Sequence, residues 1–199
     1  MTTTFPVGWV LRASTVGFAV GCRVFQPTTP HFGDLVKVPL SGGDNTDIFG
    51  LIYDVQVPDD PSVRQLILVG QMEPEVMRDQ RENRLVPIEV SVLVVGYQQG
   101  GRIVQGLPPQ PPISLDTLVV CDDDDLRRFS EQLDYLRLTL NAAQIPADEL
   151  LIANLSRAAE TRSPEIRRVF LLKAGRELAR LLSYDLVRLD SILRRIRPV

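Results

Sequence analysis

The sequence predicts an α+β chain in which a small closed β-barrel is followed by an all-helical segment. Before Asp122 the chain holds 12 of its 13 glycines and 12 of its 15 prolines, with β-branched runs between them. After Asp122 only Gly175 remains, and leucine and arginine recur at steps of three and four residues. Glycine and proline separate short strands, whereas leucine at helical spacing builds amphipathic helices. We therefore expect a β domain over residues 1–124 and a helical domain of three to four helices over residues 125–199.

The β domain is expected to contain eight short strands separated by turn-forming clusters such as Ser41–Asn45 and Gln99–Gly101. Short strands at this spacing form a sandwich or a barrel, and closure into a barrel removes the exposed edges of a small sheet. The strongly charged insert Glu73–Arg84 is expected to be a short helix or an exposed loop. The predicted strands are Gly8–Ala13, Phe18–Val24, Asp34–Val38, Ile48–Val57, Gln65–Val69, Pro87–Tyr97, Arg102–Gln105 and Thr117–Cys121.

The helical domain opens with one apolar seam, whose spacing predicts a single helix after a run of aspartates that suits its N-terminus. Pro146 is placed to begin the next helix, Ala147–Arg162. Ser163 and Pro164 are typical of the start of another helix. The helical spacing of apolar residues is then nearly continuous from Ile166 to Ile196, and the helix could be interrupted around Ser183. The residues of the first seam are Leu126, Phe129, Leu133, Leu136 and Leu140.

The last part of the chain carries a second leucine stripe that is long enough to require a partner surface. Burying five or six such side chains would contribute about 10 kcal/mol before entropy, at about 2 kcal/mol each. The partner could be the other helices, the barrel or a second chain, and the sequence does not decide between them. The candidate interface residues are Leu178, Leu182, Leu186, Leu189, Leu193 and Ile196.

The chain offers few groups for catalysis or zinc binding. His31 is the only histidine; it could act as a general base or a pH sensor, but an ordinary loop histidine is the simpler interpretation. One histidine and two separated cysteines, Cys22 and Cys121, make no adequate zinc ligand set. Both cysteines lie in apolar strand-like runs, which indicates buried thiols, although a barrel could bring them together as a disulfide.

The sequence contains neither a typical metal-binding loop nor a phosphate-binding loop. Clustered carboxylates such as Asp122–Asp125 can hold calcium or magnesium, but metal loops place their ligands at alternate positions, and a helix N-terminus explains four consecutive aspartates more simply. No glycine-rich loop ending in Gly-Lys-Ser/Thr is present, and the closest segment, Leu172–Arg176, lies inside a helical pattern. We expect a protein that is not an enzyme and needs no cofactor or metal, unless His31 or the aspartates converge with other polar groups.

The charge distribution gives little support to nucleic-acid binding. The net charge is −3, and proteins that coat nucleic acid are usually basic. The C-terminal end is locally basic and could contact phosphates, although cations at the end of a helix are favoured in any case. No secretory signal and no apolar run of about 18 residues is visible, so we expect a cytoplasmic protein without a membrane span. The candidate phosphate contacts are Arg188, Arg194, Arg195 and Arg197.

The barrel half resembles the HAS-barrel domain, which is named after HerA-type DNA translocases and ATP synthase. The resemblance begins with His31–Val38 and Ile48–Val55, and it continues with the long strand Val86–Tyr97. It ends with the proline-rich segment Leu107–Pro112 and with Asp116–Leu126, where a final strand leads to an acidic helix start. The resemblance extends over roughly residues 7–129, and its motifs carry fold rather than catalysis.

The resemblance implies a docking role. In the translocases the barrel precedes an ATPase domain, crowns a ring, and packs against neighbouring barrels or docks partner proteins; here helices stand in place of the ATPase. We therefore expect a non-catalytic scaffold that docks through its barrel and helices onto itself, as a homo-oligomer, or onto a HerA-like ring-shaped P-loop ATPase. The alternative is an accessory factor of a DNA-processing or translocase complex that contacts nucleic acid through its basic C-terminal end.

Overall fold

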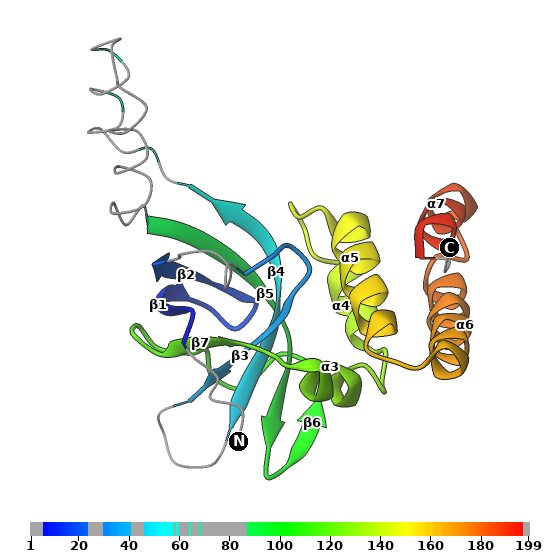
Figure 1. The fold of residues 1–199 in the computed structure, drawn as a ribbon, viewed down its shortest axis with the longest axis horizontal. Helices are drawn as coiled ribbons and strands as arrows, with labels where there is room; N and C mark the ends of the chain where they lie inside the picture. Colours follow the sequence, from blue (N-terminus) through cyan, green and yellow to red (C-terminus); the bar gives the residue numbers. More distant parts are fainter. Residues whose placement is uncertain are drawn as a thin grey trace.

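The computed structural model describes residues 6–23, 30–40, 46–57 and 87–196, together with the single positions 59, 64 and 68. Six antiparallel strands close into a barrel in the order β2-β1-β7-β3-β4-β5, because β5 pairs back onto β2. Helices α3 to α7 follow the barrel (Figure 1). The predicted α+β class is therefore confirmed. The strands are β1 Gly8–Ala13, β2 Gly17–Arg23, β3 Leu35–Pro39, β4 Asp47–Gln56, β5 Pro87–Gln99, β6 Arg102–Val104 and β7 Thr117–Val120, and β6 only extends β5 as a hairpin.

Each described strand overlaps one predicted from the sequence, within a residue or two at its ends. Gly50 lies at a shift of register between β4 and β5, and a Cβ atom there would come within 2.2 Å of Val92 Cγ1, so this glycine marks a bulge at which the two strands approach closely. The predicted strand Gln65–Val69 and the charged insert Glu73–Arg84 lie outside the described residues, apart from Leu68, whose backbone is helical rather than extended.

The helical segment has five described helices, where three to four were expected, because the first seam is divided. Ser130 ends α3, and its hydroxyl donates to the Leu126 carbonyl at 2.5 Å. Gln105, in the loop after β6, stabilises the break: its Nε2 donates to the Phe129 carbonyl at 2.7 Å, and its Oε1 accepts from the Tyr135 backbone N–H at 2.9 Å. The helices are α3 Asp123–Phe129, α4 Tyr135–Leu140, α5 Ala147–Glu160, α6 Pro164–Leu181 and α7 Leu186–Ile196.

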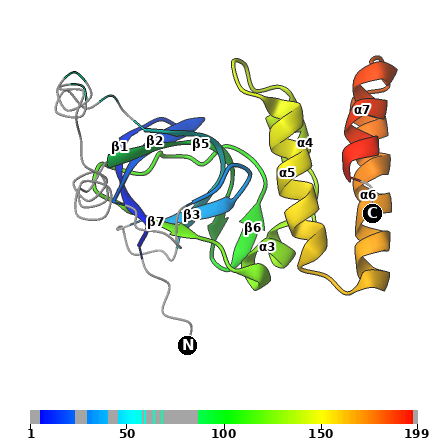
Figure 2. The ribbon, with the colours of Figure 1, turned by 45° about the horizontal axis from the view of Figure 1, so that its top comes forward.

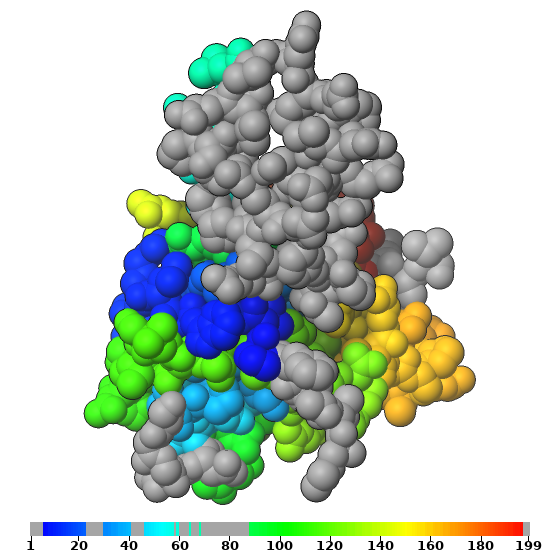
Figure 3. Space-filling view, turned by 60° about the vertical axis from the view of Figure 1, so that its left-hand side comes forward, coloured from blue at the N-terminus to red at the C-terminus, as the bar shows by residue number. Residues whose placement is uncertain are grey.

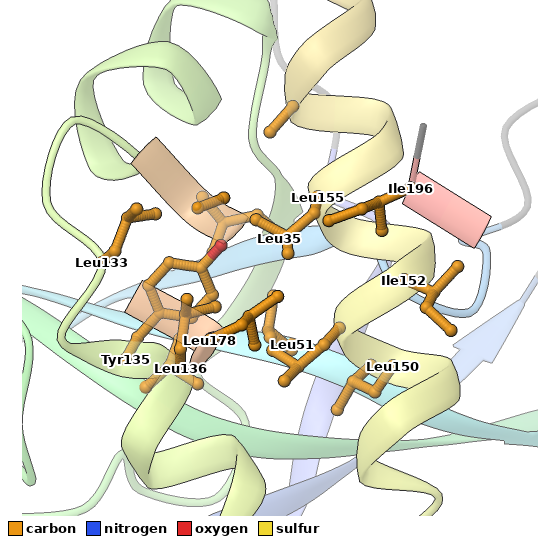
Figure 4. Packing of buried hydrophobic residues seen from close by; sticks show 14 of the residues in the cluster. Leu35, Leu51, Leu133, Tyr135, Leu136, Leu150, Ile152, Leu155, Leu178 and Ile196 are labelled. Atoms are coloured by element: carbon orange, nitrogen blue, oxygen red, sulfur yellow. The ribbon is translucent and has the colours of Figure 1, made fainter. Parts of the chain in front are cut away.

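The barrel and the helices form three layers. Helices α4 and α5 lie beside the barrel, and α6 and α7 lie on the far side of α5 (Figures 1 and 2). One core fills the inside of the barrel and includes Val10, Val36 and Leu118. A second core joins the outer face of β3, β4 and β5 to the helices, and Figure 4 shows Leu35 and Leu51 of the barrel among the helical side chains of this core.

The loop before β3 lies close against α5. Gly33 has a φ of +87°, and a Cβ atom on it would lie 2.5 Å from the Ala153 side chain, so only glycine fits. Its carbonyl accepts from Asn154 Nδ2 at 3.1 Å, and Asn154 Oδ1 accepts from the Tyr135 hydroxyl at 2.8 Å. Both polar side chains are buried, so this chain of hydrogen bonds satisfies groups that would otherwise be costly. The segment that carries the start of the HAS-barrel resemblance thus joins the two parts of the chain.

Candidate interaction surfaces

The leucine stripe predicted as an interface is largely covered within the chain. Leu178, Leu182, Leu189 and Ile196 are buried in the core shared with α5, Leu193 is half-buried, and only Leu186 is 68% exposed. The sequence showed that this stripe needs a partner, and in this structure α5 is that partner for four of its six residues. Its role toward another chain stays a prediction.

The described arginines of the C-terminal end are paired with carboxylates. Arg188 binds Asp148 on α5, with Nη2 and Oδ1 2.7 Å apart. Arg195 pairs with Glu149, also on α5, and Arg194 lies 2.5 Å from Asp190 on its own helix. Arg197 lies outside the described residues. In these pairs the carboxylates neutralise the arginine charge that would otherwise be available to a phosphate. The geometry therefore gives no support to the alternative of nucleic-acid binding, which stays a prediction.

Two of the four aspartates at the start of α3 have defined roles in the fold. Asp122 caps the helix, accepting from the Asp125 backbone N–H at 2.8 Å. Asp125 joins the helix to β3 through Lys37 Nζ at 2.5 Å, and it also accepts from Arg128 at 2.6 Å. Burial alone would raise the pKa of the Asp125 carboxyl, but these two hydrogen bonds outweigh burial and hold that pKa below its ordinary value.

The remaining candidate groups do not converge on a common site. The His31 side chain is 71% exposed, with Nδ1 3.6 Å from Asp34 Oδ2. Cys22 and Cys121 are buried free thiols, as the apolar runs around them predicted. Across the described ranges, no group of three or more His, Cys, Asp or Glu side chains could hold a metal ion. No described helix is long and apolar enough to span a membrane.

The barrel itself exposes an apolar surface on the side away from the helices. Val10 of β1 points into the barrel core, and its neighbours Trp9 and Leu11 point outward, with exposed fractions of 42% and 50%. The turn before β7 runs alongside them, since the Leu115 backbone N–H donates to the Val10 carbonyl at 2.9 Å. Figure 3 shows blue residues of the first two strands at the surface beside green residues from later in the chain. We call Trp9, Leu11, Ile113 and Leu115 the barrel patch.

Leu115 is the most unusual member of the barrel patch. Its φ is +73°, in the left-handed region that favours glycine or asparagine, and its side chain is 76% exposed. The turn is held in this shape by Asp116, whose carboxylate accepts from the Ile113 backbone N–H at 2.9 Å. A leucine at this backbone angle costs conformational energy, and its exposed side chain gains no burial in return. Residues with unfavourable backbone angles occur often at functional sites.

Sequence reasoning missed the barrel patch, although part of it left a signal. The run Trp9-Val10-Leu11 places apolar side chains on both faces of a strand. A barrel strand with one face in the core needs apolar residues on that face only. The φ of Leu115 has no comparable signal, because it depends on the turn that Asp116 closes.

Comparison with known proteins leaves the family open. No protein-family model matches the chain, and no curated protein matches it either. What is established is therefore the closed six-stranded antiparallel barrel and its helices.

Proposed function

We propose that the chain is a non-catalytic assembly module of the HAS-barrel type, whose barrel packs against another barrel through the barrel patch. The observation that carries the proposal is an exposed leucine, Leu115, held at a costly backbone angle beside the outward-facing Trp9 and Leu11. Exposed apolar side chains gathered on one surface are typical of protein interaction sites. The partner barrel belongs to a second copy of the chain or to a HerA-like ring ATPase.

The structural roles of the resembling segments support the HAS-barrel assignment. Gly33 occupies a position that only glycine fits, and Gly50 lies at a bulge between two central strands. Strand β7 closes the barrel between β1 and β3, and two residues later the chain enters α3 with Asp122 as its cap. The glycine motifs, the last strand and the acidic helix start behind the resemblance thus have physical roles in the barrel or at its exit.

The position of the barrel patch supports a barrel-to-barrel contact. The helices cover the face made by β3, β4 and β5, and β1 lies on the opposite side of the barrel (Figure 2). A stable interface needs about 800 Å² from each partner, with a small apolar centre and a polar rim. Four large apolar side chains suit such a centre.

The test is the oligomeric state of a double variant, Leu11→Ser with Ile113→Ser, measured by sedimentation velocity. Both side chains are at least half exposed, so the fold should tolerate the changes. We expect the wild type to associate and the variant to remain monomeric, while the control Val187→Ser, an exposed valine of α7, associates like the wild type. A wild-type monomer that also fails to bind a purified HerA-like ATPase would contradict the proposal.

A further inference from the structure

A groove of about 940 Å³ runs along α6 and is closed on one side by the C-terminal end of α7. The floor of the groove is apolar, and three arginines of α6 stand around it. None of the described residues that line it is acidic. The floor is made by Leu171, Leu172, Gly175 and Ala179 of α6 with Leu193 and Ile196 of α7, and the arginines are Arg167, Arg168 and Arg176.

These three arginines form no ion pair with a carboxylate among the residues that the structure describes. Arg168 and Arg176 form no ion pair with any residue that the structure describes, and Arg167 donates to the Ala159 carbonyl at 3.1 Å. Of the five described arginines of the helical segment without an ion pair, three therefore line the groove, and Arg137 and Arg162 lie outside it. By contrast, seven arginines of the segment pair with an acid: Arg127, Arg128, Arg157, Arg180, Arg188, Arg194 and Arg195.

Gly175 provides a second, independent observation. A glycine inside a helix costs about 1 kcal/mol relative to alanine, yet neither backbone nor packing requires one here. Its φ is not positive, and a Cβ atom would only reach ordinary contact with Leu193 Cδ2, at 3.4 Å. Because Gly175 has no side chain, the floor of the groove is deeper midway along α6.

We propose that this groove binds an acidic amphipathic helix of a partner protein. Leucine-like side chains at steps of three and four would lie on the apolar floor, and Glu or Asp beside them would face Arg168 and Arg176, as in other helix-in-groove complexes. From Pro164 to Ala179 the groove extends along about 22 Å of α6, which matches about four helical turns. This surface and its partner are separate from the barrel patch, so the inference does not depend on the barrel-to-barrel contact.

The apolar floor decides between an acidic helix and other anionic partners. Nucleic acid would offer phosphates to the arginines but nothing suited to the leucine floor, and no described residue lining the groove is aromatic, so bases have no stacking surface. An anionic membrane surface offers both charge and apolar chains, and it is therefore an explicit outcome of the test.

The experiment is a display selection of random peptides of about 16 residues on the full-length chain, with the folded variant Arg168→Glu/Arg176→Glu as the counter-selection. Both arginines are exposed, so the variant should melt like the wild type. We expect the enriched peptides to carry apolar residues at helical spacing with an excess of Glu and Asp. Fluorescence anisotropy of one selected peptide then measures affinity, and we expect the double reversal to weaken binding by about tenfold or more, and less so at high salt.

Two matched controls sharpen the result. Arg137→Glu reverses another arginine that has no ion pair with a described residue, on α4 and outside the groove, and it should leave affinity unchanged. A peptide with its acidic residues replaced by lysine should bind the Arg168→Glu/Arg176→Glu variant better than the wild type. Gly175→Met, which favours the helix but fills the floor, should also reduce binding by about tenfold.

Three results would each overturn the inference. The first is no enrichment over the counter-selected variant, and the second is enriched peptides without an acidic excess. The third is a wild-type chain that binds phosphatidylglycerol vesicles in a manner dependent on Arg168 and Arg176 but binds no acidic peptide, which would assign the groove to a lipid surface.

Discussion

Replacing Leu115 by glycine should stabilise the isolated chain and weaken its assembly at the same time. A leucine in the left-handed region costs about 1–2 kcal/mol, and glycine removes that cost. Glycine also gives the unfolded chain more freedom, which costs about 0.5–1 kcal/mol. Because the side chain is 76% exposed, its loss removes little burial. The free energy of unfolding should therefore rise by about 0.75 kcal/mol, the difference between the middles of these two ranges, which raises the melting midpoint by about 1.5–3 °C in a chain of this size.

The assay is urea or thermal unfolding of Leu115→Gly at a concentration where the chain is monomeric, because association would itself stabilise the wild type. The matched control is Ile113→Gly, an exposed neighbour without a positive φ, which should lose about 0.5–1 kcal/mol through the added freedom alone. If Leu115→Gly destabilises the monomer as much as Ile113→Gly does, the strain argument fails. If it is more stable yet associates as well as the wild type, Leu115 is strained for a reason other than assembly.

Three further predictions concern the seam between barrel and helices. Gly33→Ala should cost about 3 kcal/mol in unfolding free energy, from the strained φ and the clash with Ala153; a cost below that of an ordinary surface change would contradict the tight seam. Tyr135→Phe should cost about 1–2 kcal/mol by leaving Asn154 Oδ1 without its donor, and an unchanged urea midpoint would refute this. Because folding lowers the pKa of Asp125, the ionised carboxylate stabilises the fold fully above about pH 4, and this contribution is lost as the pH falls through the folded-state pKa. The variant Asp125→Asn lacks this carboxylate, so it should lose less stability than the wild type between about pH 5 and pH 2.

The sequence was sufficient for the elements whose signal is local. Strand-like runs such as Gly8–Ala13 and the break in composition at Asp122 depend only on neighbouring residues, and the barrel followed by helices was predicted from them. The division between α3 and α4 was not, because it is held by Gln105, which lies 24 residues before Phe129. A local pattern cannot show a side chain that reaches back from another part of the fold.

The candidate surfaces were harder to predict for the same reason. The leucine stripe that includes Leu178 indicated that a partner surface was needed, but only the position of α5 shows that this partner lies within the chain. Arg188 and Arg176 look alike in the sequence, and they differ because Arg188 forms an ion pair with Asp148, 40 residues away, whereas Arg176 forms none with a described residue. The barrel patch likewise depends on a turn that brings Leu115 next to β1.

The most direct test of the proposed assembly is the rate at which a maleimide labels Ser114→Cys, an exposed position between Ile113 and Leu115. Burial raises the pKa of the Cys22 thiol to about 11 and that of Cys121 well above its ordinary value, so both native thiols should react slowly and the label reports position 114. We predict that labelling slows as the chain associates with itself or with a HerA-like ATPase. Association that leaves this rate unchanged would place the contact elsewhere and contradict the assignment of the barrel patch.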